Sequence, residues 1–321
     1  EGFDKNSYGT SWSMAKSFYA ALIGISIDRG EINGLDDKVN LYLDYFNDER
    51  SKITIRDLLN MSSGLEYPEN QHENMFFLND HLEYSKSIGV EKEANTVFEY
   101  NNVNSMLLGD ILEKATGKKA DLLLNERILD PIGVKNSTVW TDNAGNPLAY
   151  CCIDMSARDY SRFGLLFSRN GNWNGNQLIS KDFVDETFTE YWDVTPQWWT
   201  NAKRGYTLHW WVSKNDEEGS IFNASGKFGQ YIFVDRENDI IFTRITKYHP
   251  TPGSIQDWGR LSRVEVNNIG RWLKVTRFLE KVGILDADDL KTPNTRKDGE
   301  SKEFYEIYGE VIDSISDLSR N

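Results

Sequence analysis

Ser13 and Lys16 lie three residues apart at the beginning of a long apolar stretch of this 321-residue sequence. A serine hydroxyl is a weak nucleophile unless a neighbouring base removes its proton. Lysine can be that base when burial or nearby positive charge lowers its pKa. If the stretch forms a buried helix, the two side chains lie one turn apart on one face, near the positive end of the helix dipole. The pair therefore indicates nucleophilic attack on an ester or amide carbonyl.

A purely structural role fits the same four residues. Serine is a common helix N-cap, and the aliphatic part of lysine can run along apolar surface to reach water. The chain contains no second S-x-x-K, but about one is expected by chance at average residue usage. A lysine in a helix without a polar face is nevertheless costly to bury unless it has a function. The tetrapeptide alone leaves both interpretations open.

Tyr100 and Asn102 form a second candidate group, placed directly before a helical pattern at 101–116. A tyrosine beside a serine and lysine pair can pass a proton to the leaving group, and an asparagine can hold the lysine or a substrate carbonyl. The same Y-x-N spacing occurs at Tyr45, but that copy lies in an acidic run and no buried helix follows it. Tyr100 is therefore the preferred candidate.

The elements that must position these residues can be read from periodicity and turn signals. The apolar run 13–27 is too long for a strand and ends at Gly30, which predicts a buried helix. Further on, the sequence predicts a mainly helical middle, then strands after residue 205, then helices again. The segment 53–65 is expected to be a short helix followed by a glycine turn, and further helices are expected over 101–116, 156–169, 264–283 and 304–318. The expected strands cover 206–212, 230–235 and 239–247, with a hairpin turn at 236–238.

These features together resemble the serine β-lactamase and penicillin-binding-protein superfamily. The shared motifs are S-x-x-K opening a buried helix, ITIRDLLNMSSGL at 53–65, Y-x-N before a helix, SARDY at 156–160 and ASGKFGQ at 224–230. Their order and spacing cover residues 11 to 280. Within the superfamily, the chain is most similar to the class C-like branch of esterases, D-peptidases and 6-aminohexanoate-dimer hydrolases.

The resemblance implies an α+β fold with an antiparallel sheet flanked by helices and a mostly helical lobe. We expect 1–30 and 205–321 to form the sheet lobe and 31–204 the helical lobe of one intertwined catalytic unit. Family members carry two strands and a helix before S-x-x-K, whereas 12 residues precede Ser13 here. We therefore expect that an N-terminal segment outside this sequence, or a second chain, completes the sheet. The sequence leaves open whether the protein is periplasmic or cytoplasmic.

The third family motif, K-[ST]-G or H-[ST]-G, has no literal copy in this chain. The register that we prefer places Ala224, Ser225 and Gly226 in the motif, with Lys227 directly after it; Lys227-Phe228-Gly229 is the other candidate. In the preferred register, the resemblance implies that the backbone N–H groups of Ser13 and Lys227 form the oxyanion hole. Ala224 then replaces the family's cation, which disfavours recognition of a β-lactam carboxylate but is compatible with ester or amide hydrolysis.

Two further substrate-binding residues follow from the resemblance. Asn102 belongs to the Y-x-N motif, and Tyr67 follows the S-S-G-L turn, a region from which nylon-oligomer hydrolases contribute a second tyrosine. Tryptophans such as Trp210 and Trp211 could line an acyl pocket, although most aromatic residues simply fill cores.

Composition excludes several other functions. A net charge of −14 disfavours nucleic acid and anionic membranes as partners, and no apolar run is long enough to span a bilayer. The four histidines lack metal-ligand spacing, so we expect no metal site and no cofactor. Cys151 and Cys152 are adjacent, and we expect them to be small buried hydrophobic residues rather than a disulfide.

The sequence thus predicts a serine hydrolase that acts through an acyl-enzyme on small ester or amide substrates. Ser13, Lys16 and Tyr100 are its expected catalytic residues. The alternative is a non-catalytic protein that keeps the fold for binding or assembly.

Overall fold

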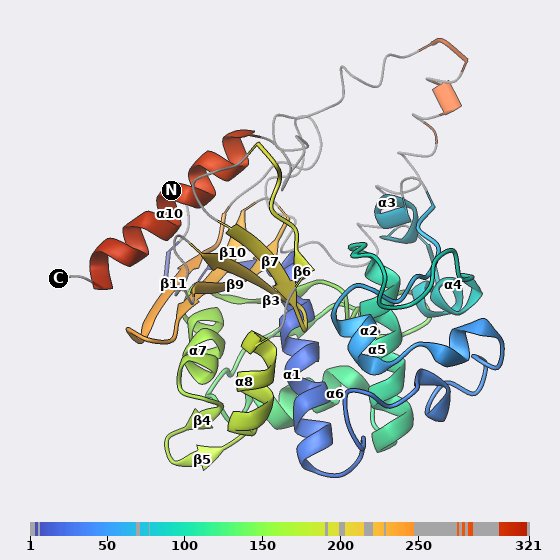
Figure 1. Cartoon of the computed structure of the whole chain (residues 1–321), viewed down its shortest axis with the longest axis horizontal. Helices are drawn as coiled ribbons and strands as arrows, with labels where there is room; N and C mark the ends of the chain where they lie inside the picture. Colours follow the sequence, from blue (N-terminus) through green and yellow to red (C-terminus); the bar gives the residue numbers. More distant parts are fainter. Residues whose placement is uncertain are drawn as a thin grey trace.

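Helix α1 (Ala15–Asp28) runs through the middle of the molecule, between a sheet and a group of shorter helices (Figure 1). The computed structural model describes residues 4–5, 7–68, 71–76, 78–189, 192–198, 203–214, 221–227, 229–246, 275, 278–279, 282–284 and 302–319. The helix is buried on every side over most of its length, as its apolar sequence predicts. It ends at Arg29, before Gly30 with a φ of +71°.

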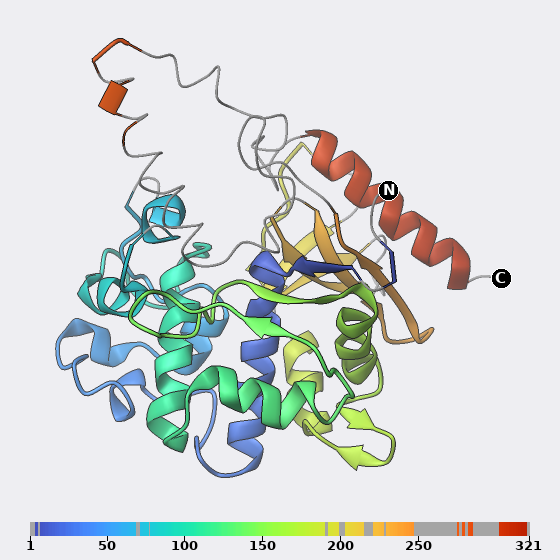
Figure 2. The same ribbon diagram turned by 180° about the vertical axis from the view of Figure 1, so that it is seen from behind.

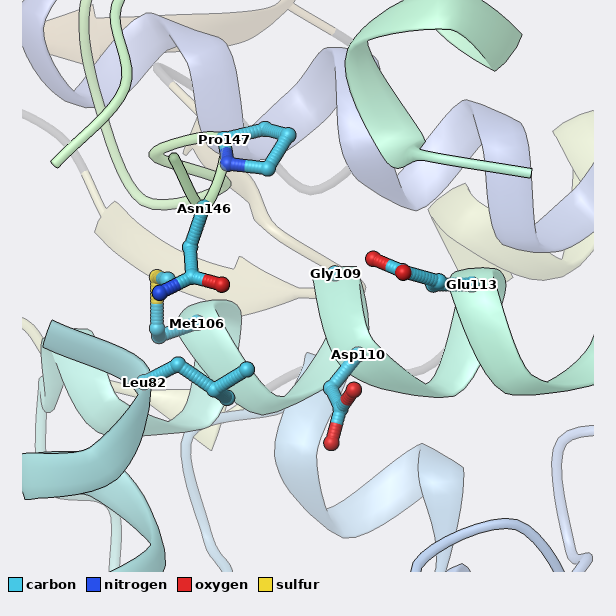
Figure 3. Close-up of a pocket in the computed structure, with 7 residues that line it drawn as sticks. All are labelled: Leu82, Met106, Gly109, Asp110, Glu113, Asn146 and Pro147. Carbon is cyan, nitrogen blue, oxygen red and sulfur yellow. The ribbon is translucent and has the colours of Figure 1, made fainter. Parts of the chain in front are cut away.

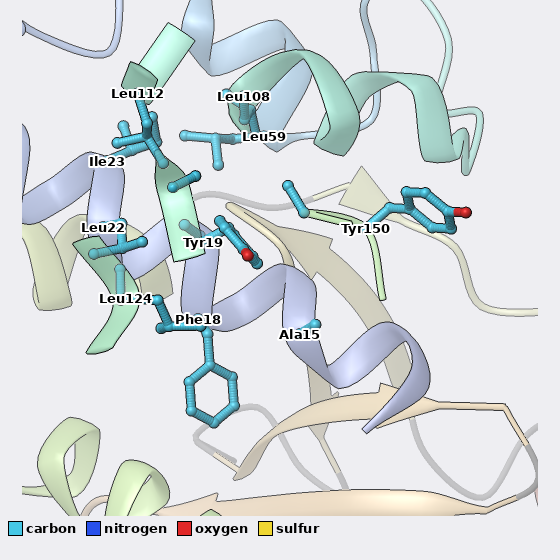
Figure 4. Close-up of a cluster of buried hydrophobic side chains, with 14 of the residues drawn as sticks. Ala15, Phe18, Tyr19, Leu22, Ile23, Leu59, Leu108, Leu112, Leu124 and Tyr150 are labelled. Carbon is cyan, nitrogen blue, oxygen red and sulfur yellow. The ribbon is translucent and has the colours of Figure 1, made fainter. Parts of the chain in front are cut away.

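The main hydrophobic core surrounds α1. In Figure 4, Tyr19 and Ile23 of α1 face leucines from several helices. These leucines are Leu59 of α2 (Ile55–Leu59), Leu108 and Leu112 of α5 (Asn102–Thr116) and Leu124 of α6 (Ala120–Leu124). The start of α1 is thereby held against the start of α5, which brings two distant parts of the sequence together.

Local capping signals determine where these helices begin and end. Thr54 and Asp57 form a reciprocal capping box at the start of α2. Asn101 caps α5 by accepting a hydrogen bond from the N–H of Val103, and Gly117 ends that helix with a φ of +71°. The remaining helices are η1 (Trp12–Met14), η2 (Val39–Leu41), η3 (Glu49–Lys52), α3 (Gln71–Phe76), α4 (His81–Ser87), η4 (Asn125–Leu129), α7 (Ala157–Ser168), α8 (Lys181–Thr189) and α10 (Lys302–Ser319).

The principal sheet is antiparallel and has the strand order β11-β10-β9-β8-β7-β6. One face packs on α1 and α7 through residues such as Ala224 and Ile232, and α10 covers the other face with Tyr308 and Ile312 (Figure 1). The strands are β6 (Trp192–Asp193), β7 (Lys203–Thr207), β8 (Trp210–Lys214), β9 (Ile221–Gly226), β10 (Gln230–Asp235) and β11 (Ile240–Arg244).

A second, three-stranded sheet lies beside the N-terminal end of α1 (Figure 2). Its order is β1 (Tyr8–Thr10), β3 (Ile153–Ser156) and β2 (Thr138–Val139). A two-stranded hairpin, β4 (Asn172–Trp173) with β5 (Asn176–Gln177), follows α7. Among the described residues, the strand that precedes Ser13 therefore joins the smaller sheet, and no described strand pairs with the outer edge of β11.

The predicted strand over 206–212 is wrong in one respect. β7 ends at Thr207 and β8 begins at Trp210, so the segment is a hairpin and not one strand. Leu208 and His209 form the turn with φ values of 36° and 64°. Leucine rarely adopts a positive φ, but the N–H of Leu208 donates to Asn60 and that of His209 donates to the carbonyl of Leu59. Tertiary hydrogen bonds therefore select the turn.

The prediction that the two cysteines are unpaired is also wrong. Cys151 and Cys152 are both buried, as expected, but they form a disulfide with each other. Cys152 adopts a φ of +75°, while the two Cα atoms lie 3.7 Å apart, the ordinary spacing across a trans peptide bond. The change in backbone direction at Cys152 lets neighbouring side chains meet, which an extended segment would prevent.

The antiparallel sheet, its flanking helices and the helix-rich middle confirm the expected fold class. Strand β10 matches its predicted bounds, and α10 confirms the expected C-terminal helix. Most of the helix expected over 264–283 lies outside the described residues. The division into two lobes stays a prediction.

Candidate active site

The short helix η1 (Trp12–Met14) presents Ser13 at the end of α1 that faces the smaller sheet. Ser11 anchors this turn, because its N–H donates to the carbonyl of Ile153 at 2.8 Å and its Oγ accepts from the N–H of Ile153 at 2.9 Å. Trp12 has a φ of 45°, a conformation that is uncommon for a bulky residue. The turn is thus held by hydrogen bonds to β3, and Ser13 stays partly exposed.

Lys16 is buried, with 1% of its surface exposed, and its amine has three neighbours. Its Nζ lies 3.1 Å from Ser13 Oγ and donates to Asn102 Oδ1 and to the carbonyl of Tyr150, both at 2.8 Å. A neutral amine has two N–H groups and one lone pair. In this neutral form the amide and the carbonyl accept the two hydrogens and the lone pair is left for Ser13, whereas the ammonium form donates to all three oxygens. Burial lowers the pKa of Lys16 well below its ordinary value, which favours this neutral form.

Tyr100 lies on the other side of the same serine. Its hydroxyl forms a hydrogen bond with Ser13, and its ring centroid lies 4.9 Å from Lys16 Nζ. Burial raises the pKa of Tyr100, so the phenol keeps its proton at neutral pH. The pKa values of Lys16 and Tyr100 are therefore displaced in opposite directions, an arrangement that suits a base and an acid acting in turn.

Tyr67 is close enough to Tyr100 for the two phenols to interact. The charge that Tyr67 would carry raises the pKa of Tyr100, whereas the positive charge of Arg204 lowers it. Tyr67 is partly buried and lies outside the helices and strands. The structure thus brings together Ser13, Lys16 and Tyr100, with Asn102 behind the lysine and Tyr67 beside the tyrosine.

Strand β9 completes this side of the site. Gly226 packs directly against the turn at 11–14, which carries Ser13, because a Cβ on Gly226 would lie 2.1 Å from the carbonyl oxygen of Ser11. The ladder between β8 and β9 ends at Asn223, so no described strand pairs with Ala224, Ser225 and Gly226 on that side. Lys227 follows the strand with an exposed side chain. The segment therefore offers its backbone groups next to Ser13.

Comparison with known proteins agrees with this geometry. The family model described as Beta-lactamase matches residues 6–264, which include every residue of the site. The chain belongs to the beta-lactamase family. Its membership confirms the resemblance seen in the motifs.

Individual relatives of this beta-lactamase family member have several activities. A 6-aminohexanoate-dimer hydrolase from Paenarthrobacter ureafaciens is 22% identical over 305 residues, which are 88% of this chain and 74% of the relative. A D-aminopeptidase from Brucella anthropi is 31% identical over 140 residues, covering 41% of this chain and only 26% of the relative. The crystal structure of a family VIII carboxylesterase has a TM-score of 0.61 at 15% identity and covers 83% of each chain, which shows the shared fold.

The sequence prediction missed two groups next to the candidate catalytic residues. The carbonyl of Tyr150 holds Lys16, but a backbone acceptor leaves no mark in a sequence. His209 is buried, with its Nε2 2.9 Å from Ser105 Oγ and its Nδ1 3.2 Å from the hydroxyl of Tyr206. Burial, and then the charge of Lys16, lower the pKa of His209 well below its ordinary value, so the ring is neutral. Its position inside a hairpin turn could not be read from the strand pattern.

The two tryptophans of β8 have different environments. Trp210 is fully buried in the core and packs on Phe163 and Phe167. Trp211 is partly buried, and its ring stacks on Tyr100 with the centroids 5.6 Å apart. Only Trp211 therefore lies beside the candidate catalytic residues in this beta-lactamase family member.

Two hollows elsewhere on the molecule do not contain any predicted site residue. The cavity in Figure 3 lies between α4, α5 and the loop at Asn146 and Pro147, and its volume of about 10 Å³ leaves room for one water molecule at most. A wider surface hollow of about 700 Å³ is lined by charged residues of 36–57 and 90–95. Within the described part of the chain there is no cluster of three potential metal ligands and no helix long and apolar enough to cross a bilayer.

Proposed function

We propose that this protein is a serine hydrolase that cleaves small esters or amides through an acyl-enzyme on Ser13. The observation that carries the proposal is the environment of the Lys16 amine. Asn102 and the carbonyl of Tyr150 accept its two hydrogens, which leaves its lone pair for the hydroxyl of Ser13. These three neighbours are neutral groups, and burial lowers the pKa of Lys16, which supports the neutral amine that a base requires.

Acylation follows from these contacts. Ser13 Oγ forms a bond to the substrate carbonyl carbon while its proton moves to Lys16. The backbone N–H groups of Ser13 and Lys227 donate to the resulting oxyanion. Tyr100 then gives its proton to the leaving oxygen or nitrogen as the bond to carbon breaks, and it recovers a proton from the Lys16 ammonium.

Deacylation repeats these transfers with water. Lys16 removes a proton from the attacking water, and the bond between Ser13 Oγ and the acyl carbon breaks as Oγ takes a proton back. Net consumption is one water for each ester or amide bond. Every group that exchanges protons has begun and ended in its original state.

The substrate class follows from β9 and from the relatives. Ala224 is buried and replaces the cation of the family motif, so no positive side chain comes from this position. The relatives include hydrolases named for 6-aminohexanoate dimers, D-amino-acid peptides and carboxylic esters. We therefore propose small ester or amide substrates in preference to β-lactams.

The test compares the wild type with Ser13→Ala. We expect Ser13→Ala to lose at least about a thousandfold in p-nitrophenyl ester turnover, the scale of losing a nucleophile. A fluorophosphonate should label the wild type at Ser13, as shown by peptide mass spectrometry. Ser7→Ala is the matched control, because among the described residues the Ser7 hydroxyl is hydrogen-bonded to the exposed Asp4 near the start of the chain.

The alternative is a non-catalytic protein that uses this fold for binding or assembly. A folded wild type that neither turns over an ester, amide and β-lactam panel nor accepts the fluorophosphonate at Ser13 would favour that alternative. Turnover that survives Ser13→Ala would exclude Ser13 as the nucleophile.

A further inference from the structure

Helix α10 (Lys302–Ser319) reaches the candidate substrate strand through a series of hydrogen bonds. The hydroxyl of Tyr308 donates to Asn223 Oδ1 at 2.6 Å, and Asn223 Nδ2 donates to Ser225 Oγ at 2.8 Å. Ser213 Oγ is hydrogen-bonded to the hydroxyl of Tyr308 as well. The series connects the C-terminal helix, β8 and β9, and it ends at a residue of the substrate-binding segment.

Three members of this series, Ser213, Tyr308 and Asn223, are almost completely buried. Ser213 and Asn223 have no exposed surface, and Tyr308 is 2% exposed. Buried polar groups cost free energy unless each is hydrogen-bonded, and a satisfied network specifies one arrangement of its members. Around them lie apolar residues of the same face, Ile221, Phe233, Ile312 and Ile315. These apolar contacts are sufficient to hold α10 on the sheet. The hydrogen-bonded series adds something that they do not supply.

What the series adds is a direction for each hydrogen bond. Tyr308 gives its one hydroxyl proton to Asn223 Oδ1, so Ser213 must donate to Tyr308. With its oxygen turned to Tyr308, the amide of Asn223 directs its NH₂ group to Ser225 Oγ. Ser225 therefore accepts a hydrogen bond from within the protein. Its own hydroxyl hydrogen is directed to a different acceptor.

The place of Ser225 indicates what that acceptor is. Ser225 is partly exposed and directly precedes Gly226, which packs on the nucleophile turn at Ser11. The β8 ladder ends at Asn223, one residue before the segment that has no described strand on that side. The segment therefore lies beside the turn that carries Ser13, to which an acyl group would be attached. A carbonyl oxygen in such an acyl group is the kind of acceptor that a serine hydroxyl binds.

We propose that Tyr308 is a positioning residue that, through Asn223, orients the Ser225 hydroxyl to donate to a carbonyl oxygen in the acyl part of the substrate. The proposal rests on the proposed hydrolase function and adds to it a preference for acyl groups with a second carbonyl. Tyr308 itself does not touch the substrate. Tyr308 is therefore expected to affect KM for substrates with a second carbonyl, and not kcat.

The test is a double-mutant cycle with Tyr308→Phe and Ser225→Ala. Two substrates of similar length are compared: the p-nitrophenyl ester of N-acetylglycine, which has a second carbonyl, and p-nitrophenyl pentanoate, which has none. For the N-acetylglycine ester, we expect each variant to raise KM about fivefold to tenfold, the scale of one hydrogen bond, with kcat within about twofold. For the pentanoate ester, we expect a smaller rise in KM, so that each variant lowers the preference for the N-acetylglycine ester about fivefold. The double variant should behave like either single variant.

Two results would overturn the proposal. The first is a double variant whose KM is the product of the two single effects, because Tyr308 would then act independently of Ser225. The second is an equal loss with both esters. Ile312→Val is the matched control, since it weakens the packing of α10 on the sheet without changing a hydrogen bond of the series. If Ile312→Val reproduces the KM effect, docking of the helix is responsible and the proposal fails.

An activity-independent measurement separates this proposal from the proposed function. If the wild type neither turns over esters nor is labelled at Ser13, the hydrolase assignment fails by itself. The positioning role is then decided by the side-chain NH₂ signals of Asn223 in ¹⁵N NMR spectra. Slow hydrogen exchange of these protons in the wild type, lost in Tyr308→Phe and kept in Ile312→Val, supports positioning by Tyr308. Equal exchange in all three proteins overturns it.

Discussion

Lys16 at the start of α1 donates a 2.8 Å hydrogen bond to Asn102 at the start of α5, although 86 residues separate them in the sequence. The contact exists because α1 and α5 pack along each other in the core. It also determines the electrostatics of the site. Burial lowers the pKa of Lys16, and the neutral amide of Asn102 adds no negative charge that would raise this pKa again.

Replacing Asn102 by Asp should therefore raise the pKa of Lys16. A carboxylate at 2.8 Å favours the ammonium form, and a neighbouring opposite charge shifts a pKa by about 1 to 3 units. The protonated lysine cannot act as the base, so the acidic limb of kcat/KM should move to higher pH by that amount. A pH–rate profile measures the shift. An acidic limb at the same pH in both proteins would contradict the role of Lys16 as the base.

Lys16 also predicts a dependence of stability on pH. Its pKa is lower in the folded protein than its ordinary value of 10.5. Between these two values the unfolded chain binds more protons, so the free energy of unfolding rises with pH across that window and is level above it. Lys16→Met removes this dependence. Urea denaturation at pH 7 and pH 9.5 should thus show the wild type gaining stability relative to Lys16→Met. A constant difference would contradict the lowered pKa.

Gly226→Ala should separate β9 from the turn at 11–14 that carries Ser13. The new methyl group would lie 2.1 Å from the carbonyl oxygen of Ser11, so either the strand or the turn must move. We expect a loss of about tenfold or more in kcat/KM, because small misplacements of reacting groups are costly. We also expect a loss of stability of about 1 to 3 kcal/mol, typical of overpacking. Kinetics and thermal denaturation measure these effects.

Gly309→Ala is the control for that variant. Gly309 lies in α10, and a Cβ there would meet no atom within 4 Å. It should leave turnover unchanged and stabilise the helix slightly. Similar kinetics for Gly226→Ala and Gly309→Ala would show that β9 does not need the close approach.

The disulfide between Cys151 and Cys152 predicts a response to reduction. The denatured protein should react with iodoacetamide only after treatment with dithiothreitol, and mass spectrometry should then find both alkylated. The pair follows Tyr150, whose carbonyl holds Lys16, so reduction of the native protein should lower kcat severalfold by loosening that acceptor. The Cys151→Ala/Cys152→Ala double variant should no longer respond to dithiothreitol. Thiols that react without reduction would contradict the disulfide.

The sequence by itself determined the elements that depend on local signals. The apolar run of α1, the Asn101 cap and Gly117 stop of α5, and strand β10 all follow from periodicity and turn chemistry. It also pointed to Ser13, Lys16, Tyr100 and Asn102, because a nucleophile and its proton-transfer partners must be particular residue types. Together with the motifs at 53–65, 156–160 and 224–230, their order and spacing predicted the family.

Only the tertiary structure decided which contacts surround these candidate catalytic residues. The carbonyl of Tyr150 is a backbone group that any residue could supply, and the left-handed turns at His209 and Cys152 are imposed by contacts with distant segments. Tyr308 meets Asn223 across 85 residues of sequence. Such contacts arise when helices and strands pack, and a local pattern carries no information about which distant partner a buried polar group will find.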